Sequence, residues 1–127
     1  MPIQRQHTNA RMSQIVVHNA TVYLAGQVGD DLSAGIEQQT RETLAAIERL
    51  LKQAGTDTRH LLSVTIYLKD IDADFAGMNR VWDLWLPEGV APARATVQAL
   101  LCEPEILVEL SVVAALPQSQ ASDLNHR

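Results

Sequence analysis

Hydrophobic and polar side chains alternate with a period of two in several stretches of the chain, which indicates β-strands. Residues 13–17 and 21–25 are two such stretches, and Asn19 between them tolerates the left-handed backbone of a tight turn, so they predict a hairpin. Residues 61–68 alternate and are rich in β-branched side chains, which predicts a central strand. The polar segment before residue 13 leaves room for a further short strand near Ile3.

A three- and four-residue spacing of apolar side chains predicts two helices. The first covers about residues 35–54, and Gly55 directly after it suits the left-handed residue that ends many helices. The second follows Asp70, and Asp72 or Asp74 is expected to cap its start. Its apolar stripe consists of Phe75, Met78, Trp82 and Trp85.

Two further apolar runs, residues 94–101 and 106–115, are separated by the short turn 102–105. This spacing predicts an antiparallel hairpin. Residues 117–127 are polar and are expected to form a disordered tail, so residues 1–116 are expected to be a single domain.

This order of elements predicts an α+β fold in which two helices pack on one face of a mixed sheet. The last strand, however, is apolar on both sides, because Val108, Leu110 and Val112 alternate with Leu107 and Val113. The second face of the sheet would therefore be exposed unless partner subunits cover it, and a closed symmetric oligomer is the usual solution. Composition does not determine the number of subunits.

Composition excludes several classes of protein. A chain of 127 residues with 46% hydrophobic and 20% charged residues fits one globular domain, and no apolar run approaches the ~20 residues that span a membrane. The N-terminal segment carries no export pattern, so a cytoplasmic location is expected. The single cysteine, Cys102, and four scattered histidines indicate neither a disulfide nor a metal site. A net charge of -5 makes nucleic acid an unlikely partner.

Arg94 is the first candidate functional residue, because it opens an otherwise apolar strand in the segment Pro92-Ala93-Arg94. A guanidinium there calls for an anion that can accept its forked donors. A salt bridge to an acidic residue or a solvated strand end explains Arg94 equally well.

Glu109 is the second candidate, because it interrupts the apolar run 106–113. Burial of a carboxyl group raises its pKa toward the range of a general base, although Glu109 could also be a structural partner of an arginine. In the predicted hairpin Glu109 faces Gln98, which is four residues or roughly 13 Å from Arg94. If both residues serve one small ligand, they are therefore expected to come from neighbouring subunits.

Two weaker candidates are Gly26, at the end of a predicted strand, and Asn79, on the second helix. Glycine permits a close approach of the backbone to a ligand, but a bulge explains Gly26 equally well. Asn79 could present its amide to a cleft or lie on the solvated side. Gly26 and Gly29 do not form a phosphate-binding loop, because no helix follows at once. Cys102 lies in a predicted turn without a histidine partner, which does not suggest a nucleophile.

Taken together, these segments resemble the RidA-like (YjgF) family, also called endoribonuclease L-PSP. The resemblance spans about residues 11–115 and depends on the order and spacing of several short motifs. These are Gly26-Gln27, Gln53-Ala54-Gly55, the strand 64–70, Phe75 with Asn79, Pro92-Ala93-Arg94, and Val108-Glu109.

The resemblance implies a chorismate-mutase-like fold and a homotrimer with three clefts between subunits. It also implies hydrolysis of reactive enamines and imines to 2-oxo acids and ammonia, with no metal or organic cofactor. Arg94 then corresponds to the arginine that binds the substrate carboxylate, and Glu109 to the acid beside the hydrolytic water. Gly26 corresponds to the backbone wall of the cleft, and Asn79 to a helix residue that faces that wall from the adjoining subunit.

Three positions depart from the best-known deaminases of the family. Met12 stands where they carry a tyrosine, Ala25 where they carry a serine, and Thr96 where many carry a cysteine. We therefore expect imine deamination with an altered substrate preference or rate. A trimer that binds small carboxylates without turnover is the alternative, and the family's older name adds a less favoured third hypothesis, RNA cleavage.

Overall fold

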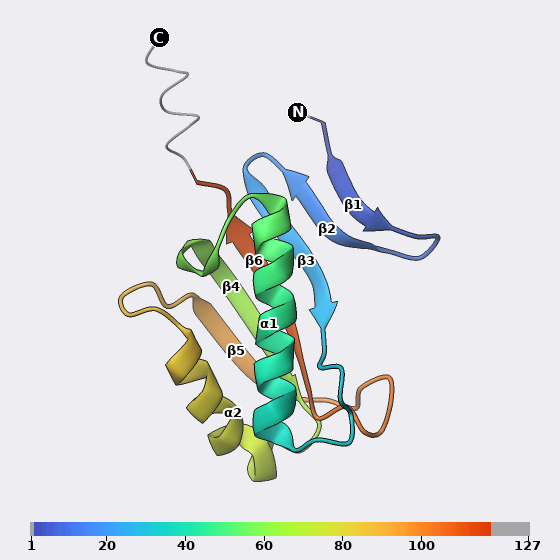
Figure 1. Ribbon diagram of the computed structural model, residues 1–127, viewed down its shortest axis with the longest axis vertical. Coiled ribbons are helices and arrows are strands. Elements are labelled where there is room, and N and C mark those ends of the chain that lie inside the picture. Colours follow the sequence, from blue (N-terminus) through green and yellow to red (C-terminus); the bar gives the residue numbers. More distant parts are fainter. Residues whose placement is uncertain (1, 118–127) are drawn as a thin grey trace.

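A computed structural model describes residues 2–117 of the chain (Figure 1). The order of strands and helices follows the sequence expectation, including the additional strand near Ile3. Residues 118–127 lie outside the described residues. Of the tail expected at 117–127, the structure therefore describes only Pro117. The elements are β1 (Gln4–Thr8), β2 (Ser13–His18), β3 (Thr21–Gln27), α1 (Ile36–Ala54), a short 3-10 helix η1 (Thr58–His60), β4 (Leu61–Leu68), α2 (Ile71–Trp85), β5 (Ala93–Gln98) and β6 (Val108–Ala115).

The predicted hairpin of β2 and β3 is confirmed. Its register pairs Val17 with Val22 and His18 with Thr21, so only Asn19 and Ala20 lie in the loop. Both have positive φ angles, 51° and 63°, as the two-residue turn that matches the twist of a hairpin requires. An asparagine adopts this backbone at little cost, whereas Ala20 is held there by the pairing on either side.

The predicted hairpin of the last two strands is wrong. The six strands are ordered β1-β2-β3-β6-β4-β5, so β4 separates β5 from β6. Strand β5 is parallel to β4, and β6 is antiparallel to both β3 and β4. Sheet position follows burial: β6 is apolar on both sides and lies inside the sheet, whereas β5 is largely exposed and forms an edge. The local pattern predicts how deeply a strand is buried, but it does not specify which strand pairs with it.

Both helices cover the same face of the sheet, as Figure 1 shows, and the α+β architecture is confirmed. The core lies between the helices and the sheet, and it consists of the side chains that the two layers direct toward each other. Strand β4 lies in the interior of the sheet as predicted. The fully buried large side chains are Ile15, Val22, Gln39, Leu44, Ile47, Leu51, Ile66, Leu68, Met78, Ile106, Val108 and Leu110.

The ends of the helices agree with the sequence only in part. Gly55 ends α1 with a φ of 93°, as predicted. The prediction that Asp72 or Asp74 caps α2 is wrong, because Asp70 is the N-cap and its side chain accepts a hydrogen bond from the amide of Ala73 at 3.0 Å. A cap must precede the helix, and α2 begins one residue after Asp70.

The apolar stripe of α2 is also divided. Met78 and Trp82 are buried under the sheet, but Phe75 is 42% exposed. The first turn of α2 therefore presents an aromatic ring to the surface, where the helical spacing predicted core.

The face of the sheet that points away from the helices is uncovered within residues 2–117 and carries exposed apolar side chains among polar ones. Tyr23 and Leu62 are 46% and 48% exposed, and Val97 at the edge is 42% exposed. This is the bare face expected from the sequence. None of the helices in the described part of the chain has the length and hydropathy needed to cross a membrane.

Candidate functional site

Arg94 is held by two residues of α2. Its Nη1 atom donates a hydrogen bond to Oδ1 of Asn79 at 2.8 Å, and its guanidinium carbon lies 5.3 Å from the ring centroid of Trp82. Its register partner on β4 is Val64, which is buried under the helices, so Arg94 leaves the sheet on the helix side. We call Arg94, Asn79, Trp82 and Thr96 the arginine cluster.

Arg94 forms no salt bridge with any residue of the described part of the chain. The side chain is exposed, but it is stacked and hydrogen-bonded rather than freely solvated. A guanidinium carries five N–H donors, so most of them remain available to a ligand. Of the alternatives left open by the sequence, a salt bridge to an acidic residue is thus removed for residues 2–117.

Thr96 belongs to the same cluster because it lies two residues after Arg94 on β5 and pairs with Ile66 on the helix side. Its hydroxyl oxygen is buried and has no hydrogen-bond partner among residues 2–117. A buried hydroxyl without a partner is uncommon. The structure therefore leaves a donor and acceptor unused two residues from the arginine.

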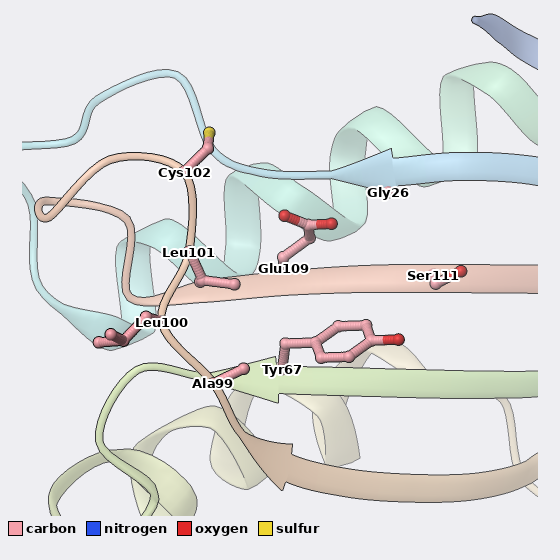
Figure 2. A pocket seen from close by; sticks show the side chains of 8 residues that line it. All are labelled: Gly26, Tyr67, Ala99, Leu100, Leu101, Cys102, Glu109 and Ser111. Atoms are coloured by element: carbon pink, nitrogen blue, oxygen red, sulfur yellow. The ribbon is translucent and has the colours of Figure 1, made fainter.

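Glu109 lies on the opposite face of the sheet. It is half-buried and pairs with Tyr67 of β4, whose side chain points away from the helices. Figure 2 shows its carboxyl group between the strand that carries Gly26 and the strand that carries Tyr67. These residues line a recess of about 340 Å³, which we call the glutamate recess. Its lining residues are Gly26, Tyr67, Ala99, Leu100, Leu101, Cys102, Glu109 and Ser111.

A β-bulge places Gly26 beside Glu109. Leu24 pairs with Val112 and Gln27 with Leu110, so Ala25 and Gly26 together oppose the single residue Ser111. A Cβ atom at residue 26 would overlap the carboxylate of Glu109. The bulge explanation offered by the sequence is therefore correct. The group that approaches Gly26 in the structure is a side chain of the same protein, and the approach of a ligand to this backbone stays a prediction.

Met12 is connected to this bulge through two glutamines. Nε2 of Gln14 lies 3.8 Å from Sδ of Met12, and Nε2 of Gln27 donates to Oε1 of Gln14 at 2.7 Å and to the carbonyl of Ala25 at 3.0 Å. Met12 is 45% exposed and lies in the turn between β1 and β2. Met12 and Ala25 thus lie on the same side of the structure as the glutamate recess and do not line it directly.

The arginine cluster and the glutamate recess are separate within one chain. Arg94 pairs with Val64 and Glu109 with Tyr67, so three residues along β4 and two strand spacings separate them, or roughly 14 Å between backbones. Their side chains also leave the sheet on opposite faces. The predicted separation is therefore correct, although the hairpin from which it was argued does not exist.

Sequence reasoning missed Trp82 as a contact of Arg94, and Tyr67, Ser111 and Leu101 as walls of the recess. Helical spacing places Trp82 on the apolar stripe of α2, and the residue is buried, but its ring also lies beneath the guanidinium of Arg94. Alternation along β4 and β6 places Tyr67 and Ser111 on the same face as Glu109, so period-two reasoning could have found both. Cys102 is exposed at the rim of the recess.

The described residues contain no group of three or more His, Cys, Asp or Glu side chains placed to hold a metal ion. The polar side chains of the two sites are a guanidinium, an amide, a carboxylate, hydroxyls and the thiol of Cys102. Such groups can orient a carboxylate and move a proton.

Comparison with known proteins gives concordant matches over nearly the whole chain. A family model described as Endoribonuclease L-PSP matches residues 3–116. RutC family protein YoaB of Escherichia coli (strain K12) is 44% identical over 116 residues, which cover 91% of this chain and 100% of that protein. A crystal structure of a YjgF family member from Neisseria meningitidis has a TM-score of 0.86 at 39% identity and covers 92% of this chain and 97% of that chain. A Rid family protein of unknown function from Yersinia pestis has a TM-score of 0.78 at 30% identity, with 86% and 90% covered.

Proposed function

The chain belongs to the endoribonuclease L-PSP family, whose members are also named RutC, YjgF and Rid, and from this premise we propose that it is a cytoplasmic enamine and imine deaminase. It hydrolyses reactive 2-imino acids of the 2-aminoacrylate type to 2-oxo acids and ammonia. The active unit is a homotrimer, and each site lies between two subunits.

The single observation that carries this proposal is the state of Arg94. Its guanidinium is positioned by Asn79 and Trp82, yet it forms no salt bridge within residues 2–117. A planar guanidinium that is held in place and has free N–H donors can bind both oxygens of a substrate carboxylate. Every 2-imino acid carries such a carboxylate next to the reacting carbon.

Glu109 supplies the proton transfers. Water adds to the carbon of the C=N bond while the Glu109 carboxylate accepts a proton from it. Glu109 returns this proton to nitrogen, which gives an adduct with one hydroxyl and one amino group on the same carbon. In a second transfer Glu109 takes the hydroxyl proton and delivers it to nitrogen, the C–N bond breaks, and ammonia leaves as the C=O bond forms. Atoms balance as imine plus water giving 2-oxo acid plus ammonia, and no cofactor takes part.

A site that uses both residues requires two copies of the chain. Arg94 and Glu109 leave opposite faces of the sheet, and the face that carries Glu109 is uncovered in the described chain and has exposed apolar side chains. In a closed ring, each subunit offers its arginine cluster to one neighbour and its glutamate recess to the other. The uncovered face is then buried, and three identical sites form.

The three departures from the best-known deaminases lie in both parts of this composite site. Met12 and Ala25 belong to the side of the recess, and Thr96 belongs to the arginine cluster. A thioether and a methyl group in place of two hydroxyls make the recess side more apolar. We infer an altered substrate preference or rate relative to those deaminases.

An assay with 2-iminopropanoate, generated in situ from alanine by an amino acid oxidase and trapped with semicarbazide, tests the activity. The wild-type chain should shorten the lifetime of the imine, and Arg94→Ala should abolish this effect while the trimer persists. If Arg94→Ala accelerates hydrolysis as well as the wild type does, the role of Arg94 is wrong. If 2-oxo acids raise the melting temperature of the wild type without any acceleration of hydrolysis, the protein is instead a carboxylate-binding trimer.

Subunit complementation tests the composite site. Arg94→Ala and Glu109→Gln should each be inactive, but mixed trimers place an intact arginine cluster against an intact glutamate recess at one interface of three. Random mixing in equal amounts should therefore restore about a quarter of the wild-type activity. A mixture that stays inactive after verified subunit exchange would show that both residues must come from one chain.

We do not propose RNA cleavage despite the name of the family. The net charge is -5, which opposes binding of a phosphate backbone. Within residues 2–117, no histidine lines the glutamate recess or contacts Arg94. Copurification of ribonuclease activity with the trimer, and its loss in Glu109→Gln, would reverse this conclusion.

A further inference from the structure

Gln39 is a polar residue that is completely buried between α1 and two loops. Its exposed fraction is 0%. A buried amide without partners is costly, so its hydrogen bonds indicate what it holds. They run to two segments far apart in the sequence.

The amide of Gln39 bridges these segments through both of its polar atoms. Oε1 accepts from the amide of Leu107 at 3.0 Å, and Nε2 donates to the carbonyl of Glu105 at 3.0 Å. Nε2 also donates to the carbonyl of Ala34 at 3.0 Å and approaches that of Leu32 at 3.4 Å. The side chain thus pairs with the backbone of residues 105–107 in the way a neighbouring strand would.

The segment held in this way leads directly into the glutamate recess. Leu107 is two residues before Glu109, and the loop 99–107 contributes four of the recess walls, from Ala99 to Cys102. At the far end of this loop, the amide of Ala99 donates to the carbonyl of Leu68 at 3.0 Å, and the next residue, Leu100, is 89% exposed. Figure 2 shows Ala99, Leu101 and Cys102 of the loop at one end of the recess, beside Glu109.

Lys69, the residue directly after β4, holds the same segment from another side. Its amide donates to the carbonyl of Leu107 at 3.0 Å, and its Nζ donates to the carbonyl of Pro104 at 2.5 Å. Lys69 is on the surface side of the fold, whereas Gln39 lies in the core beneath the segment. Residues 104–107 are therefore hydrogen-bonded both to Gln39 of α1 and to Lys69, directly after β4.

We infer that Gln39 is a positioning residue of the reaction, which fixes the loop 99–107 and, through Leu107, the carboxyl group of Glu109. This inference rests on the proposed function. Gln39 touches neither the recess nor the reacting atoms, so its effect acts through Glu109. A small displacement of a proton-transferring carboxylate lowers turnover more than it lowers substrate binding.

The experiment compares Gln39→Met, which has a similar length but no amide, with Thr40→Val as the matched control. Thr40 is on the same helix and 1% exposed, and its hydroxyl donates within the helix to the carbonyl of Ile36 at 2.7 Å. We expect Gln39→Met to lower kcat about ten- to a hundredfold with little change in KM, while Thr40→Val changes stability but not kcat. If Gln39→Met does not fold, Gln39→Asn, which keeps an amide but cannot reach both loops, takes its place and should also lower kcat relative to Thr40→Val.

Two further measurements separate positioning from general stability. Amide hydrogen exchange of residues 99–107 should become faster in Gln39→Met and Gln39→Asn and remain unchanged in Thr40→Val. In a Gly26→Ala background, in which the added Cβ atom displaces the Glu109 carboxylate, Gln39→Met should cause less than an additive loss of kcat, because the residue through which it acts is already displaced.

Wild-type kcat in a folded Gln39→Met or Gln39→Asn trimer would overturn the inference, and so would an equal loss of kcat in Thr40→Val. An additive loss in the double variant would overturn it too. If the wild type hydrolyses no imine, the proposed function fails, and unchanged exchange of the loop in the Gln39 variants would separately reject its positioning role.

Discussion

Gly26 and the carboxyl group of Glu109 occupy adjoining space across two neighbouring strands. A Cβ atom at residue 26 would lie 2.9 Å from Cδ and 3.3 Å from Cγ of Glu109, and it would overlap Oε2. Glycine is therefore required at this position by the proposed general base, and not by backbone conformation, since Gly26 has no positive φ angle.

Gly26→Ala should leave the fold intact and displace the Glu109 carboxylate, because the atoms in its way are the end of a flexible side chain. We expect kcat for imine hydrolysis to fall about ten- to a hundredfold. The melting temperature should change little. Gly35→Ala is the control, since a Cβ at Gly35 meets no atom within 4 Å, and it should retain wild-type kcat. Full activity of Gly26→Ala would mean that Glu109 is not placed by this contact.

Trp82 should contribute to binding of the substrate carboxylate through Arg94. Trp82→Leu removes the ring 5.3 Å from the guanidinium, whereas Trp82→Phe keeps an aromatic face there. A cation–π contact of about 0.5–1 kcal/mol corresponds to a rise in KM of about two- to fivefold in the leucine variant. Steady-state kinetics of both variants check this. Equal KM values in the two would exclude the ring's electrostatic role and leave only its packing.

Asp70 should stabilise α2 as its N-cap. Asp70→Ala removes the acceptor for the amide of Ala73 and should lower the free energy of unfolding by about 1 kcal/mol. Asp72→Ala removes a charge from the same turn without a cap and should have a smaller effect. Urea unfolding at neutral pH measures both. A larger effect of Asp72→Ala would restore the assignment expected from the sequence.

Glu42 should make stability depend on pH. Its pKa lies below the ordinary value, chiefly because its carboxylate accepts hydrogen bonds from the amide of Asp31 and from Gln38, with a further bond from the amide of Asp30. The folded state therefore binds this proton less readily than the unfolded chain. The contribution is complete above the unfolded pKa and is lost as pH falls through the folded pKa, which is the lower of the two.

Denaturant unfolding at several pH values, with Glu42→Gln beside the wild type, checks this. The wild type should exceed the variant in stability at pH 7, and the difference should shrink as the pH approaches 3. A difference that stays constant with pH would mean that the effect of the substitution is steric rather than electrostatic.

The sequence by itself determined the elements, because each depends on neighbours along the chain. The two-residue turn at Asn19 and Ala20, the end of α1 at Gly55 and the alternation of β4 are all local. The sequence also indicated the sheet's uncovered face and drew attention to Arg94 and Glu109, since a charge in an apolar run is visible without coordinates.

Only the tertiary structure decided which elements are neighbours. Strand β6 pairs with β3 and β4 instead of β5, because a strand that is apolar on both sides is best buried inside the sheet, and nothing within the strand specifies its partner. The contacts of Arg94 with Trp82, of Gly26 with Glu109, and of Gln39 with residues 105–107 have the same origin. Each joins residues that are 12 to 83 positions apart in the chain. Such contacts arise from the packing of whole elements, whereas periodicity and capping report only the three or four residues on either side.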